Sequence, residues 1–283
     1  ESDADLPSPL QDNLCGPPEE AAVTAAGCTL SDIEVAVETA RAQGGGVICL
    51  PACDVSLGDE GIALPGGVQL IGAGRDTTIL RDTVIDYSPR FHGTVGDGLG
   101  RISNLSIING FDEANSPFVF RGLPGARMDH AYFEGRFSTF ANVSLTGGDS
   151  SWAVIDHCEF NLQTSYGFYT FGNDEYVENI ESSACTELLG TARGAGGTVF
   201  VEDCLFTGFY DHLMDGRRAA HYVFRHNEVR YEEGSGPLEG HGPTDPADDE
   251  YATGTNCIEV YSSTIIQDPP SPSAGILFRS GCG

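Results

Sequence analysis

Hydrophobic residues recur along this chain with two different periods. The first is helical and spans residues 31–43, where Ser31 and Glu34 have the spacing of a capping box and Gly44 follows as a stop signal. The apolar positions of this predicted helix lie on one face and are Ile33, Val37 and Ala40. The second period is that of short strands separated by glycine and proline. The first of these predicted strands span residues 47–50, 68–71 and 78–80.

From residue 102 a six-residue pattern repeats: apolar, polar, polar, small, any residue, apolar. Its copies span residues 102–107, 128–133, 155–160, 201–206, 224–229 and 260–265, so they start 26, 27, 46, 23 and 36 residues apart. Such spacing with short strands is typical of a solenoid, in which each coil buries its neighbour's face. The interval of 46 predicts a further coil around residues 177–182. The interval of 36 predicts one coil with an insertion at residues 236–252.

Three segments carry a resemblance to a known family. Residues 44–52 read Gly-Gly-Gly-Val-Ile-Cys-Leu-Pro-Ala, and residues 64–75 read Leu-Pro-Gly-Gly-Val-Gln-Leu-Ile-Gly-Ala-Gly-Arg. Together with residues 151–160, they resemble coils of the pectate-lyase-like β-helix proteins. The resemblance covers residues 29–283 as architecture and implies an all-β, right-handed parallel β-helix with an N-terminal capping α-helix.

Two regions follow from this interpretation. Residues 1–27 are rich in acidic residues and proline and are predicted to form a flexible tail. Residues 28–283 form the β-helix domain, with its cap helix at about 31–43. The open last coil leaves room for the domain to continue beyond residue 283.

The chain is strongly acidic. It contains 42 acidic and 14 basic residues, which gives a net charge of −28, and every basic residue is arginine. Such a charge repels nucleic acid and anionic membranes, so neither is predicted as a partner. No apolar run is long enough to insert into a bilayer. A soluble, salt-adapted surface is the simplest interpretation, and an acidic polysaccharide needs a divalent cation or a local arginine cluster to bind.

Nine cysteines predict an oxidising compartment, and therefore a secreted or cell-surface protein with disulfides. Cys15 is a candidate partner of Cys28, or Cys49 of Cys53, and the connectivity stays open. The odd count leaves one thiol unpaired or bonded to another chain.

Two repeat positions predict stacked side chains. The small position is expected to form an internal ladder of Cys158, Cys204 and Asn227. His130 and His157 also occupy equivalent positions, which fits either a metal pair or a stacked turn. The stacked turn is favoured because no third ligand is evident.

The densest group of candidate site residues lies between residues 210 and 241. Four of the 14 arginines fall within residues 217–230, and the planar guanidinium group suits a carboxylate or sulfate. The candidate catalytic residues are Arg217, Arg218, Arg225, His226, His241 and Asp211. The candidate substrate-binding residues are Tyr210, His212, Arg230, Glu239 and Arg279.

A lyase that acts on uronic acids needs three groups. They are a cation or arginine on the carboxylate, a base for the C5 proton and an acid at the leaving oxygen. The chain has no lysine, so a lysine base is excluded. The resemblance implies an arginine base and acidic residues that hold Ca²⁺, for which Asp211 and Asp215 are the candidates. The first prediction is therefore a protein that binds an extracellular acidic polysaccharide and cleaves it by β-elimination.

Two alternatives remain open. Gly240-His-Gly242 follows Asp211 by one coil, and Leu277-Phe-Arg279 follows one coil later, in an order similar to that of the polygalacturonases. Those hydrolases use paired carboxylates, although Tyr210 stands here where the first Asp of the pair is expected. The other alternative is a non-catalytic surface, structural or adhesive protein, which self-associates through an uncapped C-terminal coil or the odd cysteine.

Overall fold

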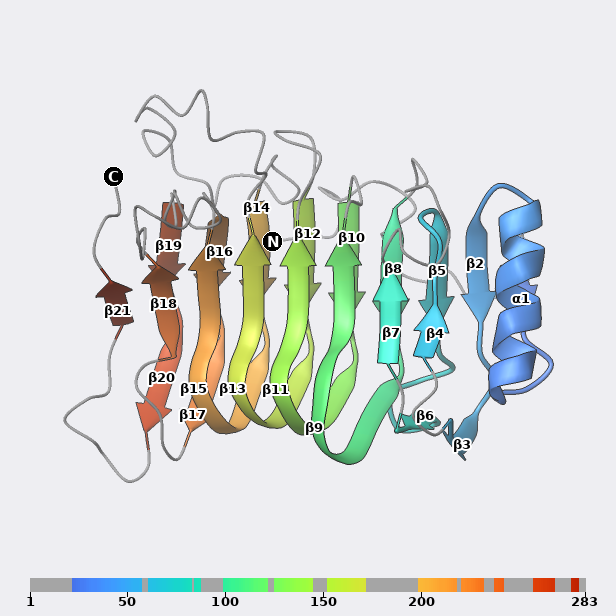
Figure 1. Ribbon diagram of the computed structural model, residues 1–283, viewed down its shortest axis with the longest axis horizontal. Helices are drawn as coiled ribbons and strands as arrows, with labels where there is room; N and C mark the ends of the chain where they lie inside the picture. Colours follow the sequence, from blue (N-terminus) through green and yellow to red (C-terminus); the bar gives the residue numbers. More distant parts are fainter. Residues whose placement is uncertain are drawn as a thin grey trace.

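The computed structural model describes residues 22–57, 61–82, 84–87, 99–121, 125–144, 152–171, 198–217, 220–231, 237–241, 257–267 and 276–279. One α-helix, α1 (Leu30–Ala42), accompanies 21 β-strands in this part of the chain. Every strand pairing there is parallel. The strands lie side by side along the long axis of the molecule (Figure 1). The predicted all-β parallel solenoid is therefore confirmed, and most of the predicted tail lies outside the described residues.

One sheet has nine strands, one from each coil. In spatial order these strands are β1 (Ala22–Thr24), β2 (Gly46–Cys49), β5 (Val68–Ile71), β8 (Gly100–Ser103), β10 (Gly125–Asp129), β12 (Trp152–Asp156), β14 (Thr198–Glu202), β16 (His221–Arg225) and β19 (Cys257–Tyr261). The predicted strands at 47–50 and 68–71 correspond to β2 and β5.

The second sheet has twelve strands. Its continuous path consists of β3 (Cys53–Ser56), β6 (Thr78–Arg81), β9 (Ser106–Arg121), β11 (Tyr132–Ser144), β13 (Glu159–Phe171), β15 (Leu205–Arg217), β17 (Glu228–Tyr231) and β20 (Thr264–Gln267). Four further strands pair off this path: β4 (Gly61–Ala63), β7 (Val84–Tyr87), β18 (Leu238–His241) and β21 (Ile276–Arg279). The last residues of the long strands β9 and β15 pair with β7 and β18, so the second sheet forms two runs in each coil.

The coil count differs from the prediction at one place. β12 pairs directly with β14, with Trp152 opposite Thr198. The interval of 46 residues is therefore one coil with a long insertion, and the extra coil predicted at 177–182 is wrong; residues 172–197 lie outside the described residues. An insertion between two strands leaves the pairing register unchanged because the chain rejoins the same sheet edge. β16 pairs directly with β19, so the interval of 36 residues is one coil, as predicted.

The core consists of inward rows of stacked side chains. In the nine-stranded sheet one buried row contains Leu70, Ile102, Met128, Ile155, Val201 and Phe224. In the second sheet the facing row contains Leu80, Ile107, Phe133, Phe160, Phe206 and Val229. The ring of Phe160 stacks on Phe133 and Phe206, with centroids 5.1 and 4.8 Å apart. Each aromatic pair adds about 0.5–1.5 kcal/mol beyond the burial of its area.

The six-residue repeat is the corner between the two sheets. Its two apolar ends, such as Ile102 and Ile107, face the core from different sheets. The third position turns the chain with a φ between 50° and 57° in Asn104, His130, His157, Asp203, His226 and Ser262. Asparagine, aspartate and histidine tolerate this left-handed region better than most residues.

The fourth position of the repeat faces inward. The backbone N–H of Cys204 donates to Oδ1 of Asn227 at 3.0 Å, and Nδ2 of Asn227 donates to the carbonyl of Val201 at 2.8 Å. Cys158, Cys204 and Asn227 are all buried. The predicted internal ladder is therefore confirmed.

The turn position produces the predicted histidine stack. The rings of His130 and His157 lie 4.9 Å apart and nearly parallel, with an interplanar angle of 4°. Their Nδ1 atoms lie 2.9 Å from a carboxylate oxygen of Asp129 and 3.0 Å from one of Asp156, respectively. These contacts fix both rings at the corner.

Helix α1 begins at Leu30, one residue earlier than predicted. Thr29 is its N-cap, and the capping box joins Thr29 to Asp32 instead of Ser31 to Glu34. Both pairs have the required spacing, and the earlier pair leaves Glu34 exposed to solvent. The buried face comprises Ile33, Ala36, Val37 and Ala40 and packs on the first coils, at one end of the molecule (Figure 1). No helix among the described residues is long and apolar enough to cross a membrane.

A disulfide joins Cys28 to Cys53 across a sequence separation of 25 residues. Both pairings proposed from the sequence, Cys15 with Cys28 and Cys49 with Cys53, are therefore wrong. Cys28 directly precedes the N-cap of α1, and the packing of α1 on the first coil brings it to β3, which contains Cys53. Cys49 is also disulfide-bonded.

Glycine occupies the bend between the two runs in two of the four long strands, β11 and β15, whereas β9 and β13 have Asn109 and Leu162 in the same register row. Gly208 of β15 has a φ of 113°, and a Cβ atom there would lie 2.1 Å from the carbonyl oxygen of Leu162 on β13. Gly135, two coils earlier in the same register row, also has a positive φ, of 154°. At Gly208 the close approach of the two backbones therefore leaves no room for a side chain.

We expect Gly208→Ala to lower the free energy of unfolding by about 3 kcal/mol or more, because it combines backbone strain with overlap on Leu162. Gly44→Ala is the matched control, since Gly44 has a φ of 86° but nothing within 4 Å of the added Cβ. Its cost is only that of the left-handed backbone, about 1 kcal/mol. Equilibrium urea unfolding measures both, and equal losses would contradict the overlap.

Candidate functional site

The strongest candidate site joins strands β15 and β18. His212 and Asp215 belong to β15, and Glu239 of β18 is the direct register partner of Asp215. Nδ1 of His212 lies 2.9 Å from Oε2 of Glu239, and all three residues are at most 3% exposed. Two carboxylates and an imidazole are therefore buried together on adjacent coils. We call His212, Asp215 and Glu239 the acid–imidazole cluster.

Core contacts hold the backbone of this cluster in place. The N–H groups of Leu213 and Met214 both donate to the carbonyl of Pro237, at 2.8 and 2.9 Å. The hydroxyl of Tyr222, a buried residue of the nine-stranded sheet, donates to the carbonyl of Glu239 at 3.2 Å. Contacts from both sheets thus fix β15 and β18 with respect to each other.

The other end of the cluster is held by β13. The hydroxyl of Thr170 donates to the carbonyl of Asp215 at 3.3 Å. Gly167 approaches Leu213 so closely that a Cβ would lie 2.4 Å from its carbonyl oxygen. The sequence thus supplies a small residue beside the strand that contains His212 and Asp215.

A second row of candidates follows two positions further along the same strands. Arg217 ends β15, while His241 and Arg279 end β18 and β21 and are direct register partners. Gly216 pairs with Gly240 immediately before them. The backbone therefore places three sequence-predicted site residues in one row across three coils. We call Arg217, His241 and Arg279 the basic row.

The remaining candidates lie elsewhere or are described only in part. Tyr210 and Asp211 lie on β15 near the bend, where the structure describes their backbone, and Arg218 lies outside the described residues. Arg225, His226 and Arg230 fall on the nine-stranded sheet, the corner and β17. The group that is continuous in sequence from residue 210 to 230 is therefore distributed around the coil.

Arg225 belongs to a buried ion pair on the nine-stranded sheet. Its Nε donates to Oε2 of Glu202, its Nη1 donates to the hydroxyl of Tyr261 at 2.8 Å, and its guanidinium lies 5.8 Å from the ring centroid of Phe200. Burial favours loss of its proton, but the hydrogen bonds to Tyr261 and Glu202 outweigh burial and raise the pKa of Arg225 above its ordinary value. The geometry gives Arg225 a structural role that connects three coils.

Four consecutive members of one register row of the same sheet are charged, namely Asp129, Asp156, Glu202 and Arg225. Asp129, Asp156 and Glu202 are consecutive register partners and are at most 1% exposed. Asp129 and Asp156 each receive an arginine from the preceding coil, and Glu202 receives Arg225 from the next. Arg101 binds both oxygens of Asp129 at 2.7 Å, and Arg127 binds those of Asp156 at 2.9 and 2.7 Å. Planar, two-point contacts of this kind are the strongest form of such an ion pair.

The pKa values of the two aspartates reflect this arrangement. Burial alone would raise the pKa of Asp129, but hydrogen bonds from His130 and Arg101 and the charge of Arg127 hold it well below its ordinary value. For Asp156, burial is likewise outweighed by Arg127 and His157, so its pKa is also lowered. Both side chains therefore remain ionised in the folded protein at neutral pH.

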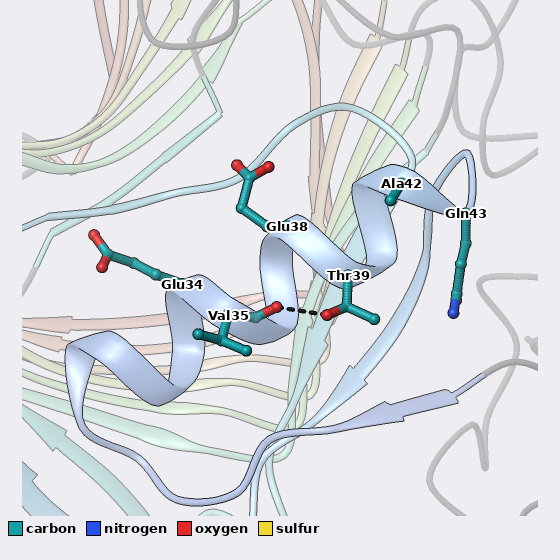
Figure 2. A pocket seen from close by; sticks show the side chains of 6 residues that line it. All are labelled: Glu34, Val35, Glu38, Thr39, Ala42 and Gln43. Carbon is teal, nitrogen blue, oxygen red and sulfur yellow. Dashed lines mark hydrogen bonds between the residues drawn. The ribbon is translucent and has the colours of Figure 1, made fainter.

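A shallow hollow of about 570 Å³ lies on the outer side of α1 (Figure 2). Its lining residues are Glu34, Val35, Glu38, Thr39, Ala42 and Gln43. Figure 2 shows the hydroxyl of Thr39 bonded to the carbonyl of Val35, at 2.7 Å, and Val35 is 65% exposed. The hollow offers two glutamates without a basic or nucleophilic partner among its lining residues, so it is a poor candidate for chemistry.

Among the described residues, no group of three or more His, Cys, Asp or Glu side chains is arranged to hold a metal ion. Asp215 belongs to the acid–imidazole cluster, and the side chain of Asp211 is not among those described. Calcium binding by this pair stays a prediction.

Comparison with known proteins finds no match to any family model, curated protein or solved structure. The assignment of function therefore rests on the residues themselves.

All three members of the acid–imidazole cluster could be identified from the sequence as site residues. The buried row of acidic residues on the nine-stranded sheet was not predicted. The residues of the cluster appeared as a metal ligand, Asp215, and as two substrate-binding residues, His212 and Glu239. The buried row occupies the second position of the six-residue repeat, where Asp129, Asp156 and Glu202 align. The sequence does contain a signal for this buried row. An acidic residue stands at the same repeat position in three coils, and an arginine stands two residues before the first of them.

We expect Asp156→Asn to lower the free energy of unfolding by about 3 kcal/mol, because it removes the carboxylate that binds the buried Arg127 at two points and leaves only the 3.7 Å ion pair with Asp129. Asp54→Asn is the matched control, since Asp54 also binds an arginine, Arg81, at two points but at the exposed surface. That change should barely move the urea midpoint. Similar losses in the two variants would contradict the assigned importance of burial.

Acid should destabilise the protein through the same aspartates. Their pKa values are lower in the folded than in the unfolded chain, so the unfolded state binds protons first as the pH falls. Their contribution to the free energy of unfolding is complete above about pH 5 and is lost progressively below that pH. We expect the urea midpoint to fall between about pH 5 and pH 2, and to fall less steeply in Asp156→Asn. If the urea midpoint falls equally steeply with pH in the variant and the wild type, Asp156 does not contribute to the loss of stability in acid.

Proposed function

We propose that this protein is a secreted, carbohydrate-active β-helix that binds an acidic polysaccharide and cleaves it at the acid–imidazole cluster. The observation that carries the proposal is the register pairing of Asp215 with Glu239, with His212 2.9 Å from the latter. Glycoside hydrolysis needs two carboxyl groups, one acid and one base or nucleophile, on either side of the bond. In-register residues of adjacent coils supply such a pair on a rigid support. Because both carboxylates are buried in this structure, the proposal requires that substrate binding exposes them.

The basic row supports an acidic substrate. Arg217, His241 and Arg279 occupy one register row two positions beyond the carboxylates. Arginine recognises a carboxylate through two parallel hydrogen bonds, which suits the uronate groups of such a chain. We assign the basic row to substrate binding and the acid–imidazole cluster to proton transfer, with Asp211 and Tyr210 on the same strand as further contacts.

β-Elimination is the second candidate reaction. It is favoured by the arginines at the end of β15, because Arg217 or Arg218 would serve as the base for the C5 proton. Ca²⁺, held by Asp211 and Asp215, would then neutralise the uronate. The two reactions leave different products, since only elimination forms an unsaturated uronide.

The finer features of the fold belong to the same proposal. We infer a right-handed solenoid, because parallel strands joined by crossover connections are right-handed in about 98% of cases. We infer that α1 caps the N-terminal end, since its apolar face packs on the first coils. Secretion is supported by the disulfide between Cys28 and Cys53.

Self-association is the alternative function that one observation favours. In the last described coil the inward residues Ile258, Val260 and Ile265 are only partly buried, and Ile266 is 44% exposed. A second copy of the chain stacked on this coil would bury them. A monomer at all concentrations in sedimentation equilibrium would exclude this alternative.

The test measures both products from a panel of uronate and sulfated polysaccharides, with calcium and with chelator. New reducing ends without ultraviolet absorbance indicate hydrolysis, and new absorbance indicates elimination. We expect Glu239→Gln to lower kcat by about 100-fold or more, as loss of a proton-transfer group does. Glu202→Gln is the matched control, because it removes a buried carboxylate from an ion pair on the other sheet.

Each outcome has a definite meaning. Full activity in Glu239→Gln would place the chemistry outside the acid–imidazole cluster. The absence of binding and cleavage across the whole panel would overturn the proposal. Unfolding curves for both variants ensure that activity is compared only where each protein is folded.

A further inference from the structure

Two free thiols lie next to each other inside the corner of consecutive coils. Cys158 and Cys204 occupy the same position of the six-residue repeat, and each is 3% exposed. The residues on both sides are register partners, Asp156 with Glu202 and Glu159 with Leu205.

The backbone spacing suits a covalent link. The N–H of Leu205 donates to the carbonyl of Cys158 at 3.0 Å, so the coils are in direct contact beside the thiols. Paired strands lie about 4.8 Å apart. Disulfides span Cα separations of about 4.4–6.8 Å. Coils at this spacing therefore place the two Cα atoms within the range that a disulfide spans.

Disulfide formation would break only weak contacts between the two thiols and nearby carbonyl groups. Sγ of Cys158 contacts the carbonyls of Asp156 at 3.3 Å and Met128 at 3.5 Å. Sγ of Cys204 contacts those of Glu202 at 3.2 Å and Ile155 at 3.6 Å. A thiol is a weak donor, so loss of these contacts costs little compared with the bond formed.

Three other cysteines indicate oxidising conditions. Cys28 and Cys53 form a disulfide, and Cys49 is disulfide-bonded as well. We propose that Cys158 and Cys204 form an inter-coil disulfide under these same conditions. This inference does not depend on the proposed polysaccharide chemistry.

The reaction is thiol–disulfide exchange with a small disulfide such as oxidised glutathione. The thiolate of one cysteine attacks that disulfide, releases one glutathione thiolate and leaves a mixed disulfide. The second cysteine, as its thiolate, then displaces the other glutathione. Two protein thiols are oxidised, and one glutathione disulfide is reduced to two thiols.

Packing of the two coils determines the stage of folding at which this exchange can occur. Burial, followed by the hydrogen bond to Cys204, raises the pKa of Cys158 well above that of an ordinary thiol. Because the thiolate is the reactive form, exchange is slow once the coils have packed. The bond therefore forms while the two coils assemble, and burial then protects it from reductants.

The test is peptide mapping of the full chain, refolded with oxidised and reduced glutathione and alkylated without reductant. Cleavage after arginine places Cys204 alone on residues 194–217 and Cys158 on residues 137–193, together with Cys185. We expect these two peptides to be linked and to separate on reduction. The link should persist in Cys185→Ala and disappear in Cys158→Ala, which assigns it to Cys158.

Thermal unfolding supplies an independent measurement. Without reductant, Cys158→Ala should melt roughly 5 °C or more below the wild type, as expected for a crosslink that closes a long loop. With reductant throughout refolding, the two proteins should melt within about 2 °C of each other. Alkylation of both Cys158 and Cys204 as free thiols after refolding, or a link that survives Cys158→Ala, would overturn the proposal.

Discussion

The whole structure depends on one constraint: neighbouring coils pair in parallel and in register, so each side chain lies against its equivalent in the next coil. On the inward rows the constraint is met by apolar stacks such as Phe160 on Phe206. On the buried charged row it brings like charges together, because Asp129 and Asp156 are direct partners. That row is tolerated because an arginine neutralises each acid: Arg101 and Arg127 reach diagonally from the preceding coil, and Arg225 is the direct register partner of Glu202.

The same constraint explains which features could be predicted from the sequence. A pattern that returns at each corner revealed the coils, and the inward cysteines and stacked histidines followed from equal repeat positions. Tertiary features without a repeat were harder to predict. The N-cap at Thr29 and the partner of Cys28 depend on how α1 packs, and the additional coil was predicted from an interval that an insertion produces equally well.

The residues of the candidate site were likewise predicted only in part from the sequence. Residues 210–230 form one group in the sequence, yet the bend at Gly208 and the following corner distribute them over different sides of the coil. His212, Asp215 and Glu239 come together because they lie on the same run of adjacent coils. Arg225 is drawn instead into the charged row. Proximity in a solenoid is decided by position within the coil, and distance along the chain is a poor guide to it.

The location of the acid–imidazole cluster links it to the pairing of two coils. His212 and Asp215 belong to one coil and Glu239 belongs to the next. In a solenoid each coil contacts only its neighbours, so two coils can separate locally while the others stay paired. Separation of these two coils would move Glu239 away from His212 without unfolding the preceding coils. The geometry of the cluster therefore depends on one interface between coils and not on the stability of the whole fold.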